Sequence, residues 1–195
     1  MARVPLRSLQ DPSEEVQSLY DVVRGVRHKV PHAADRQSGS IPEKLPEMWR
    51  ALAHSPLLGK WVAEGSKVFF TENGWAADNP GPRQLLILTL SRRLGSELVF
   101  RWHAGLAESC GISREKVDAL REGSACAGAS RAFDDDERLL ISFADEVATT
   151  GNAGAGIFAE VLERYGTKSA VEISTFIAFY LCVISLCNVL GVQDD

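Results

Sequence analysis

PRQLLILTLSRRLGSELVFRWHAGLAESCGIS, residues 82–113, is the stretch that decides the fold. Its apolar run over residues 84–94 has the length of a helix and ends at Gly95. Ser96 is predicted to cap a second helix that continues to Cys110. The stretch therefore predicts two consecutive helices joined by a short turn.

Helix signals continue on both sides of this stretch, and no strand-like alternation persists. Asp11-Pro12-Ser13-Glu14 places a capping Asp, a first-turn Pro and a Glu in the order that starts a helix. Further helices are predicted near residues 12–23, 45–53, 56–70, 113–123, 134–147, 157–165 and 169–190, with loops at residues 24–40 and 71–82. We therefore predict an all-α fold, a compact bundle of about seven or eight helices.

Composition and charge fit one soluble globular domain. The chain has 195 residues, of which 45% are hydrophobic and 24% charged, the balance of an ordinary globular protein. Its 21 Lys and Arg against 26 Asp and Glu give a net charge of −5, which argues against a nucleic-acid binder with a general basic field. We expect a single domain over residues 1–195, with an N-terminal helix and loop in residues 1–44 and a core in residues 45–192.

Two features bear on the compartment. The N-terminus lacks the apolar segment of a secretory signal, and polar residues interrupt the apolar stretch from Ala170 to Val192. We interpret that stretch as a helix in a core or at a subunit interface, not as a membrane span. We expect a cytoplasmic protein without membrane or nucleic-acid partners. Without a secretion signal, we expect reduced thiols at the four cysteines, which form no C-x-x-C pair: Cys110, Cys126, Cys182 and Cys187.

One of the four histidines stands out. His103 shares a helical face with Val99, Leu106 and Cys110, so most of its neighbours on that face are apolar. Such a histidine is either a core side chain that donates to a carbonyl or an acid/base in an apolar pocket, where its ordinary pKa near 6.5 suits proton transfer. Spacing alone favours the core interpretation.

The deciding stretch also resembles the carboxymuconolactone decarboxylase family, which shares its fold with alkylhydroperoxidase D-like proteins. The resemblance rests on Arg83-Gln84-Leu85-Leu86-Ile87-Leu88, then Ser91-Arg92-Arg93-Leu94-Gly95-Ser96, then Trp102-His103. It covers most of the chain from Leu45 onward. It implies an all-α domain of the alkylhydroperoxidase D-like type, a homo-oligomer (trimer or hexamer), and an active site beside the histidine, formed partly at a subunit interface.

Departures from the family pattern remove most of its acids and thiols. The peroxidase branch uses a C-x-x-C pair where this chain has Ser96 and Val99, and a relay Glu where it has Gln84. No thiolate forms at the first two positions, and Gln84 cannot exchange a proton at neutral pH. The decarboxylase branch uses a Glu at the position of Val99. Of the family's site residues, only His103 remains.

The expected site centres on two side chains. The resemblance points to His103 as general acid/base, and Gln84 is predicted to polarise a carbonyl or enolate oxygen. Candidate substrate-binding residues around them are Ser96, Val99, Phe100, Trp102, Arg92 and Glu172. No metal site and no cofactor are expected, since His28 and His32 lie in a predicted loop and make a weak metal pair.

Several of these candidates have a plain structural alternative. Arg92 and Arg93 suit a helix C-terminus, and aromatic side chains at helical spacing usually fill a core. Glu97 is interpreted as a first-turn acid, and Cys110 as a packed thiol. Glu172 lies near the start of an apolar helix and is either placed by the helix dipole or buried with a raised pKa.

The leading functional prediction is a cofactor-free enzyme that acts on a cyclic or carbonyl-containing organic acid. Decarboxylation, isomerisation, cyclisation or a lyase step all fit, because each passes through an enolate-like state that His103 and Gln84 can stabilise. The alternative is a non-catalytic oligomeric ligand-binding or scaffold protein that inherited the fold without the chemistry. An alkylhydroperoxidase-type peroxidase is a minor alternative, because its dithiol is missing.

Overall fold

The described part of the chain is helical, as the sequence predicts. A computed structural model describes residues 2–29, 45–71, 74–123 and 131–193, and no strand occurs within those ranges. The helices pack as two compact units: unit 1 comprises residues 1–73 with 185–195, and unit 2 comprises residues 74–184. The all-α prediction is therefore confirmed, and the single-domain organisation stays a prediction.

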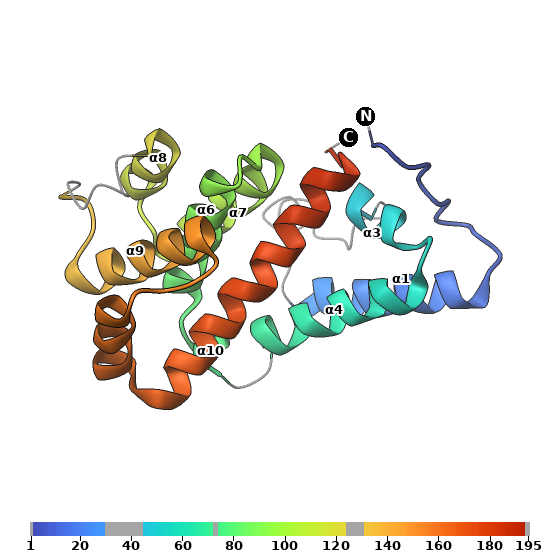
Figure 1. Ribbon diagram of the computed structural model, residues 1–195. Coiled ribbons are helices and arrows are strands. Elements are labelled where there is room, and N and C mark those ends of the chain that lie inside the picture. Colours follow the sequence, from blue (N-terminus) through green and yellow to red (C-terminus); the bar gives the residue numbers. More distant parts are fainter. Residues whose placement is uncertain (1, 30–44, 72–73, 124–130, 194–195) are drawn as a thin grey trace. The chain divides into compact units, whose positions relative to one another are not determined.

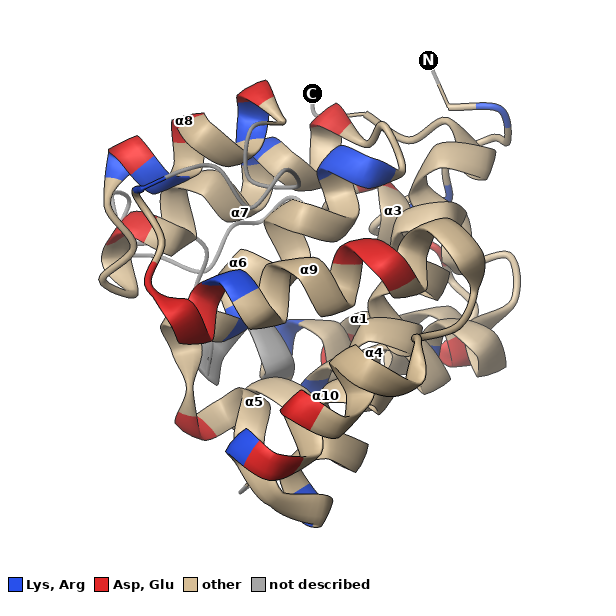
Figure 2. Cartoon of the chain, turned by 60° about the vertical axis from the view of Figure 1, so that its left-hand side comes forward, with Lys and Arg blue, Asp and Glu red and all other residues tan. Residues whose placement is uncertain are grey.

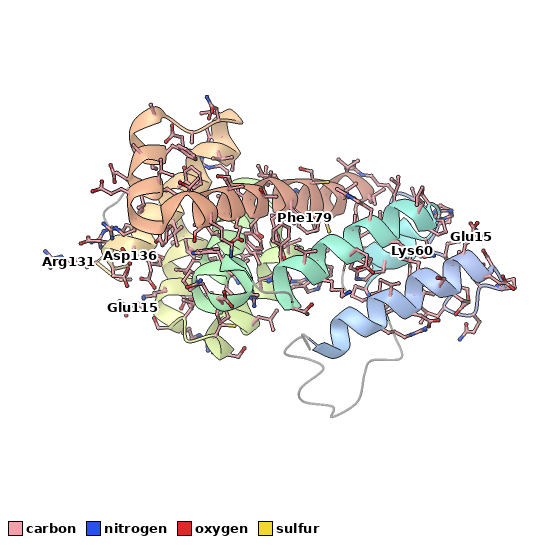
Figure 3. The ribbon with its side chains drawn as sticks, turned by 90° about the horizontal axis from the view of Figure 1, so that it is seen from below. Glu15, Lys60, Glu115, Arg131, Asp136 and Phe179 are labelled. Carbon is pink, nitrogen blue, oxygen red and sulfur yellow. The ribbon has the colours of Figure 1, made fainter. Side chains whose placement is uncertain are left out.

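Unit 1 contains α1 (Glu14–Lys29), α3 (Glu47–Leu52), α4 (Pro56–Thr71) and the last residues of α10 (Ala155–Leu190). Helix α1 lies along α4, the helix on which Figure 3 labels Lys60 (Figures 1 and 3). A Cβ atom on Gly59 of α4 would lie 2.6 Å from Leu19 Cδ2 of α1, so the glycine allows this close approach. The buried face of α1 consists of Val16, Leu19, Tyr20 and Val23.

Three contacts join the C-terminal residues to the rest of unit 1. The Arg3 amide donates to the Leu190 carbonyl at 2.8 Å, and the Gln193 amide donates to Glu47 Oε2 at 2.8 Å. Cys187 Sγ lies 3.3 Å from Met48 Sδ. Burial raises the pKa of the Cys187 thiol from 9.0 to about 12, because the apolar surroundings disfavour the thiolate.

Unit 2 is arranged around α6 (Pro80–Arg93), and residues 83–91 of this helix are all buried. The helices α5 (Trp75–Asp78), α7 (Glu97–Ser109), α8 (Arg114–Glu122) and α9 (Asp135–Thr150) all contact it (Figures 1 and 2). A helix covered on all sides is apolar around most of its circumference. Any polar side chain on α6 within this stretch is therefore held in a desolvated environment.

Two helix starts in unit 2 have a side-chain cap, and the predicted cap at a third is absent. The Ser113 hydroxyl accepts the Lys116 amide at 3.4 Å at the start of α8. Asp134 and Glu137 form a capping box at the acidic start of α9 (Figure 2). Ser96 stands at the N-terminus of α7 but makes no capping hydrogen bond, so its predicted capping role is wrong.

Two predicted loops are partly helical. Helix α1 continues to Lys29, past the loop expected from residue 24, and residues 30–44 lie outside the described ranges. The loop expected over residues 71–82 contains α5 and the start of α6. Pro80 occupies the first turn of α6, where the missing N–H and fixed φ of proline suit a helix start. The breaker residues there begin a helix instead of interrupting one.

The last predicted helix pair is confirmed. α10 consists of two helical segments that meet at Gly166, whose φ of 74° and ψ of 165° are not helical. This φ lies in the left-handed region that glycine adopts without steric cost. Of the helices in the described ranges, α10 alone is long and apolar enough to cross a membrane by length and composition. Its apolar side chains include fully buried ones of unit 2: Ile173, Phe176, Ile177 and Ile184.

Candidate functional site

The turn between α6 and α7 places the two central candidates on neighbouring helices. The Leu94 amide donates to the Leu90 carbonyl at 2.9 Å, and the Ser96 amide donates to the Ser91 carbonyl at 2.8 Å. These bonds satisfy carbonyls at the end of α6. The chain then enters α7, which packs against α6. Gln84 and His103 are thereby brought together from the two helices.

The predicted pair forms a direct hydrogen bond. His103 Nδ1 lies 2.8 Å from Gln84 Oε1, and the two residues are 5% and 1% exposed. With the Gln84 amide oriented so that Oε1 faces the ring, Nδ1 carries the hydrogen and donates it. The other ring nitrogen, Nε2, then holds a lone pair. In this orientation the imidazole has the tautomer whose Nε2 can accept a proton.

One buried ring contacts His103, and one buried cation is the chain neighbour of Gln84; neither was assigned a role from the sequence. The Tyr180 ring meets the His103 ring edge to face, with centroids 5.8 Å apart. Phe179, labelled on α10 in Figure 3, packs against Tyr180 at 5.9 Å. The Arg83 guanidinium is buried and interacts electrostatically with Tyr180. We call Arg83, Gln84, His103 and Tyr180 the buried polar cluster.

Arg83 is the cation of this cluster. Its Nη1 donates to the Ala76 carbonyl at 2.8 Å. Burial lowers the pKa of the Arg83 guanidinium below its usual range, while Tyr180 and Cys110 oppose the shift, because desolvation penalises the charged form. An arginine is charged at neutral pH in proteins. A signal was available in the sequence: Arg83 directly precedes the apolar run of α6, and an Arg is rarely buried there without a polar partner.

The apolar candidates lie in the core. Val99 and Phe100 are 1% and 2% exposed. Phe100 belongs to a hydrophobic cluster with Leu85 and Leu88 of α6, and its ring lies 4.4 Å beneath the Arg121 guanidinium. Trp102 is half-buried. Phe100 therefore has a packing role that needs no ligand.

The charged candidates of α6 and α7 do not join the buried polar cluster. Arg92 is exposed, and its Nε donates to the Arg121 carbonyl at 2.8 Å. Arg93 pairs with Asp145, and its Nε donates to that carboxylate at 2.6 Å. Glu97 pairs with Arg121 at 2.8 Å. These contacts support the structural interpretation of Arg92, Arg93 and Glu97.

Glu172 is held at another point of unit 2. Its Oε2 accepts the Trp75 amide at 2.9 Å, and its Oε1 lies 3.6 Å from Lys168 Nζ. The carboxylate therefore anchors the start of α5. Its side chain is 30% exposed, so Glu172 is a partly solvated structural acid.

The remaining reactive residues add no second centre to the described ranges. No group of three or more His, Cys, Asp or Glu converges there as a metal site would require. Cys110 and Cys182 are half-buried and Cys187 is buried. The side chains of His28 and His32, and the whole of Cys126, lie outside what the structure describes.

Comparison with known proteins supports the fold. No protein-family model matches the chain, and no curated protein matches it significantly. A cysteine-to-alanine variant of the debrominase Bmp8, solved in complex with 2,3,4-tribromopyrrole, is similar with a TM-score of 0.74 at 17% identity, covering 100% of this chain and 94% of that one. Apo Bmp8 is similar with a TM-score of 0.72 at 18% identity, covering 98% and 90%. The expected alkylhydroperoxidase D-like helical bundle is confirmed as the fold.

Proposed function

We propose that this chain is a small-molecule enzyme in which His103 acts as general acid/base. The observation that carries the proposal is the buried 2.8 Å hydrogen bond from His103 Nδ1 to Gln84 Oε1. A base needs an unprotonated nitrogen and a second group that fixes its tautomer. When Gln84 Oε1 accepts from Nδ1–H, Gln84 is that second group and Nε2 is the unprotonated nitrogen. The fold that it shares with a debrominase solved in complex with a small cyclic compound, 2,3,4-tribromopyrrole, supports the assignment to small-molecule chemistry.

The proposed reaction class is proton transfer next to a carbonyl. His103 Nε2 removes a proton from the carbon beside the carbonyl, the C–H electron pair forms the C=C bond of an enolate, and the carbonyl π electrons move to oxygen. Return of the proton to the same or another carbon completes an isomerisation. The amide nitrogen of Gln84 and the guanidinium of Arg83 are the polar groups that we expect to stabilise the enolate oxygen.

Debromination is not part of this proposal. The thiol chemistry of the family that the sequence resembles uses positions 96 and 99, which hold Ser96 and Val99. A serine hydroxyl and a valine side chain supply no electrons to a carbon–halogen bond. Proton transfer needs only the side chains that the structure brings together.

The test is hydrogen–deuterium exchange at carbon. Purified protein is incubated in D₂O with a panel of cyclic keto acids, 4-oxocyclohexanecarboxylate and 3-oxocyclopentanecarboxylate among them, and loss of the α-proton signals is followed by NMR. Wild-type protein is expected to accelerate exchange, and His103→Gln to lose at least 100-fold of that acceleration, since general acid–base catalysis typically contributes about 10²–10⁴-fold.

The matched control is His54→Gln. His54 is exposed, and its Nε2 contacts the Pro5 carbonyl at 2.7 Å in unit 1, so its loss is expected to leave exchange unchanged. Saturable binding without exchange favours the non-catalytic ligand-binding alternative. Exchange that persists in His103→Gln removes the proposed role of this residue.

A further inference from the structure

The N-terminus of α7 holds a buried hydroxyl that the described structure leaves without a hydrogen bond. Ser96 is 3% exposed, and its Oγ has no partner among the described residues. It occupies the N-cap position but accepts no bond from the first turn. A buried hydroxyl without a partner is destabilising, and such a group calls for an explanation.

The surroundings of this hydroxyl suit an oxygen ligand. The first amide groups of a helix have no carbonyl partner within the helix, and the helix dipole places partial positive charge there. In α7, a helix of 13 residues, the usual acceptor for these amides would be the Ser96 side chain, but it forms no capping hydrogen bond. A carboxylate or enolate oxygen can accept from the hydroxyl and from first-turn amides together.

The carboxylate of the first-turn acid does not compete with an external anion for the start of α7. Glu97, the first-turn acid of α7, directs its carboxylate to Arg121 at 2.8 Å, and its side chain is 64% exposed. The negative charge of Glu97 is thus compensated outside the buried face. The helix start remains suited to an external anion.

Ser96 lies on the same side of α7 as His103. Ser96, Val99 and His103 follow at positions i, i+3 and i+7, and all three are buried, which places them on one helical face. Seven residues rise by about 10 Å along a helix axis, and helical side chains lean toward the N-terminus, which brings the imidazole closer to Ser96. Val99, which is 1% exposed, lies between the two polar groups on this face.

We propose that the Ser96 hydroxyl and the first-turn amides of α7 bind the carboxylate of the substrate whose carbonyl-bearing ring lies over Val99 toward His103. This inference rests on the proposed function and names its substrate class: a small cyclic keto acid with the carboxylate and the reacting carbon at opposite ends. Ser96 is a binding residue in this scheme, and His103 moves the proton.

The experiment compares two probes that differ only in charge. Amide chemical shifts of ¹⁵N-labelled protein are followed during titration with 4-oxocyclohexanecarboxylate and with its neutral carboxamide. The carboxylate is expected to cause saturable shifts at the Glu97 and Leu98 amides. The carboxamide is expected to bind at least tenfold more weakly, because it brings no negative charge to the helix N-terminus.

Variants separate the hydroxyl from general effects on folding. Ser96→Ala is expected to weaken carboxylate binding at least tenfold, Ser96→Cys to weaken it similarly, and Ser96→Thr to retain most of it. Ser113→Ala is the matched control, since Ser113 also stands at a helix N-terminus and its hydroxyl accepts the Lys116 amide. That variant is expected to bind as the wild type does.

Three results overturn the inference: no saturable shift at these amides, equal affinity for the carboxamide, or unchanged affinity in both Ser96→Ala and Ser96→Cys. In the last case the hydroxyl holds at most an ordered water. The proposed function fails separately. His103→Gln that binds the carboxylate and exchanges protons at the wild-type rate refutes the acid/base role and leaves the Ser96 subsite in place.

Discussion

Replacing Gln84 by Met tests the bond on which the site is built. Methionine keeps the linear shape of glutamine and removes its hydrogen-bonding groups. The His103 Nδ1–H would then be buried without its acceptor, because the pair is 5% and 1% exposed and the bond is 2.8 Å long. An unsatisfied buried donor costs about 1–3 kcal/mol, so we expect Gln84→Met to lower the free energy of unfolding by that amount.

A double-mutant cycle isolates the pair from the loss of packing. In Gln84→Met with His103→Leu neither polar group remains, and replacing both partners by apolar groups is much less costly than removing one. The double variant is therefore expected to be more stable than the sum of the two single losses predicts. Equilibrium urea unfolding followed by circular dichroism measures all four proteins.

The control lies on the same helix. Thr89→Val removes a hydroxyl that donates to the Leu85 carbonyl at 2.8 Å. Since that carbonyl belongs to the helix ladder, we expect a loss of no more than about 1 kcal/mol. A Gln84→Met variant within about 0.5 kcal/mol of wild type, or a cycle that is additive within about that value, would refute the reasoning.

Further predictions concern thiols and assembly. The pKa of the Cys187 thiol is raised from 9.0 to about 12, so its contribution to stability is complete below pH 9 and is lost as pH rises toward 12. At about 1.4 kcal/mol for each pKa unit, urea unfolding should show roughly 2 kcal/mol of stability lost by pH 10.5. The Cys187→Ala variant should lack this loss, and Cys182→Ala should keep it. Alkylation of native protein at pH 8, read by mass spectrometry, should label Cys182 and Cys110 before Cys187, with Cys110 not fastest; the reverse order contradicts the packing. We propose that the expected homo-oligomer forms through α4, where Leu57, Leu58, Trp61 and Val68 are 79%, 57%, 57% and 55% exposed. These side chains offer on the order of 500 Å² of apolar surface per copy, so pairing two copies buries roughly 1,000 Å², the area of a specific interface. Trp61→Glu should then lower the mass seen in sedimentation, and a wild-type monomer contradicts the proposal.

The helices were predictable where local chemistry decides them. The glycine at 95 and the capping groups at Ser113 and Asp134 act through neighbouring backbone atoms, so their signals are complete in the sequence. α5 was missed because it is four residues long and lies among breaker residues. The start of α6 was missed because a proline can begin a helix as well as interrupt one.

The candidate site was predictable in its centre and not in its outer parts. Gln84 and His103 were singled out from the sequence, and the structure joins them. Arg83 and Tyr180 were not, because the contact of Tyr180 with His103 joins residues distant in sequence, and helical periodicity describes only one element at a time. Ser96 matches a common capping pattern, and only its missing hydrogen bond sets it apart.

Determining the tautomer of His103 tests the proposed acid/base role most directly. Long-range ¹H–¹⁵N spectra of histidine-labelled protein report which ring nitrogen carries the hydrogen, and Gln84→Met and His103→Gln serve to assign the signals. We expect the hydrogen on Nδ1 and a lone pair on Nε2. A hydrogen on Nε2 would contradict the proposed role, because the remaining lone pair would then face Gln84 and no base would be left for a substrate.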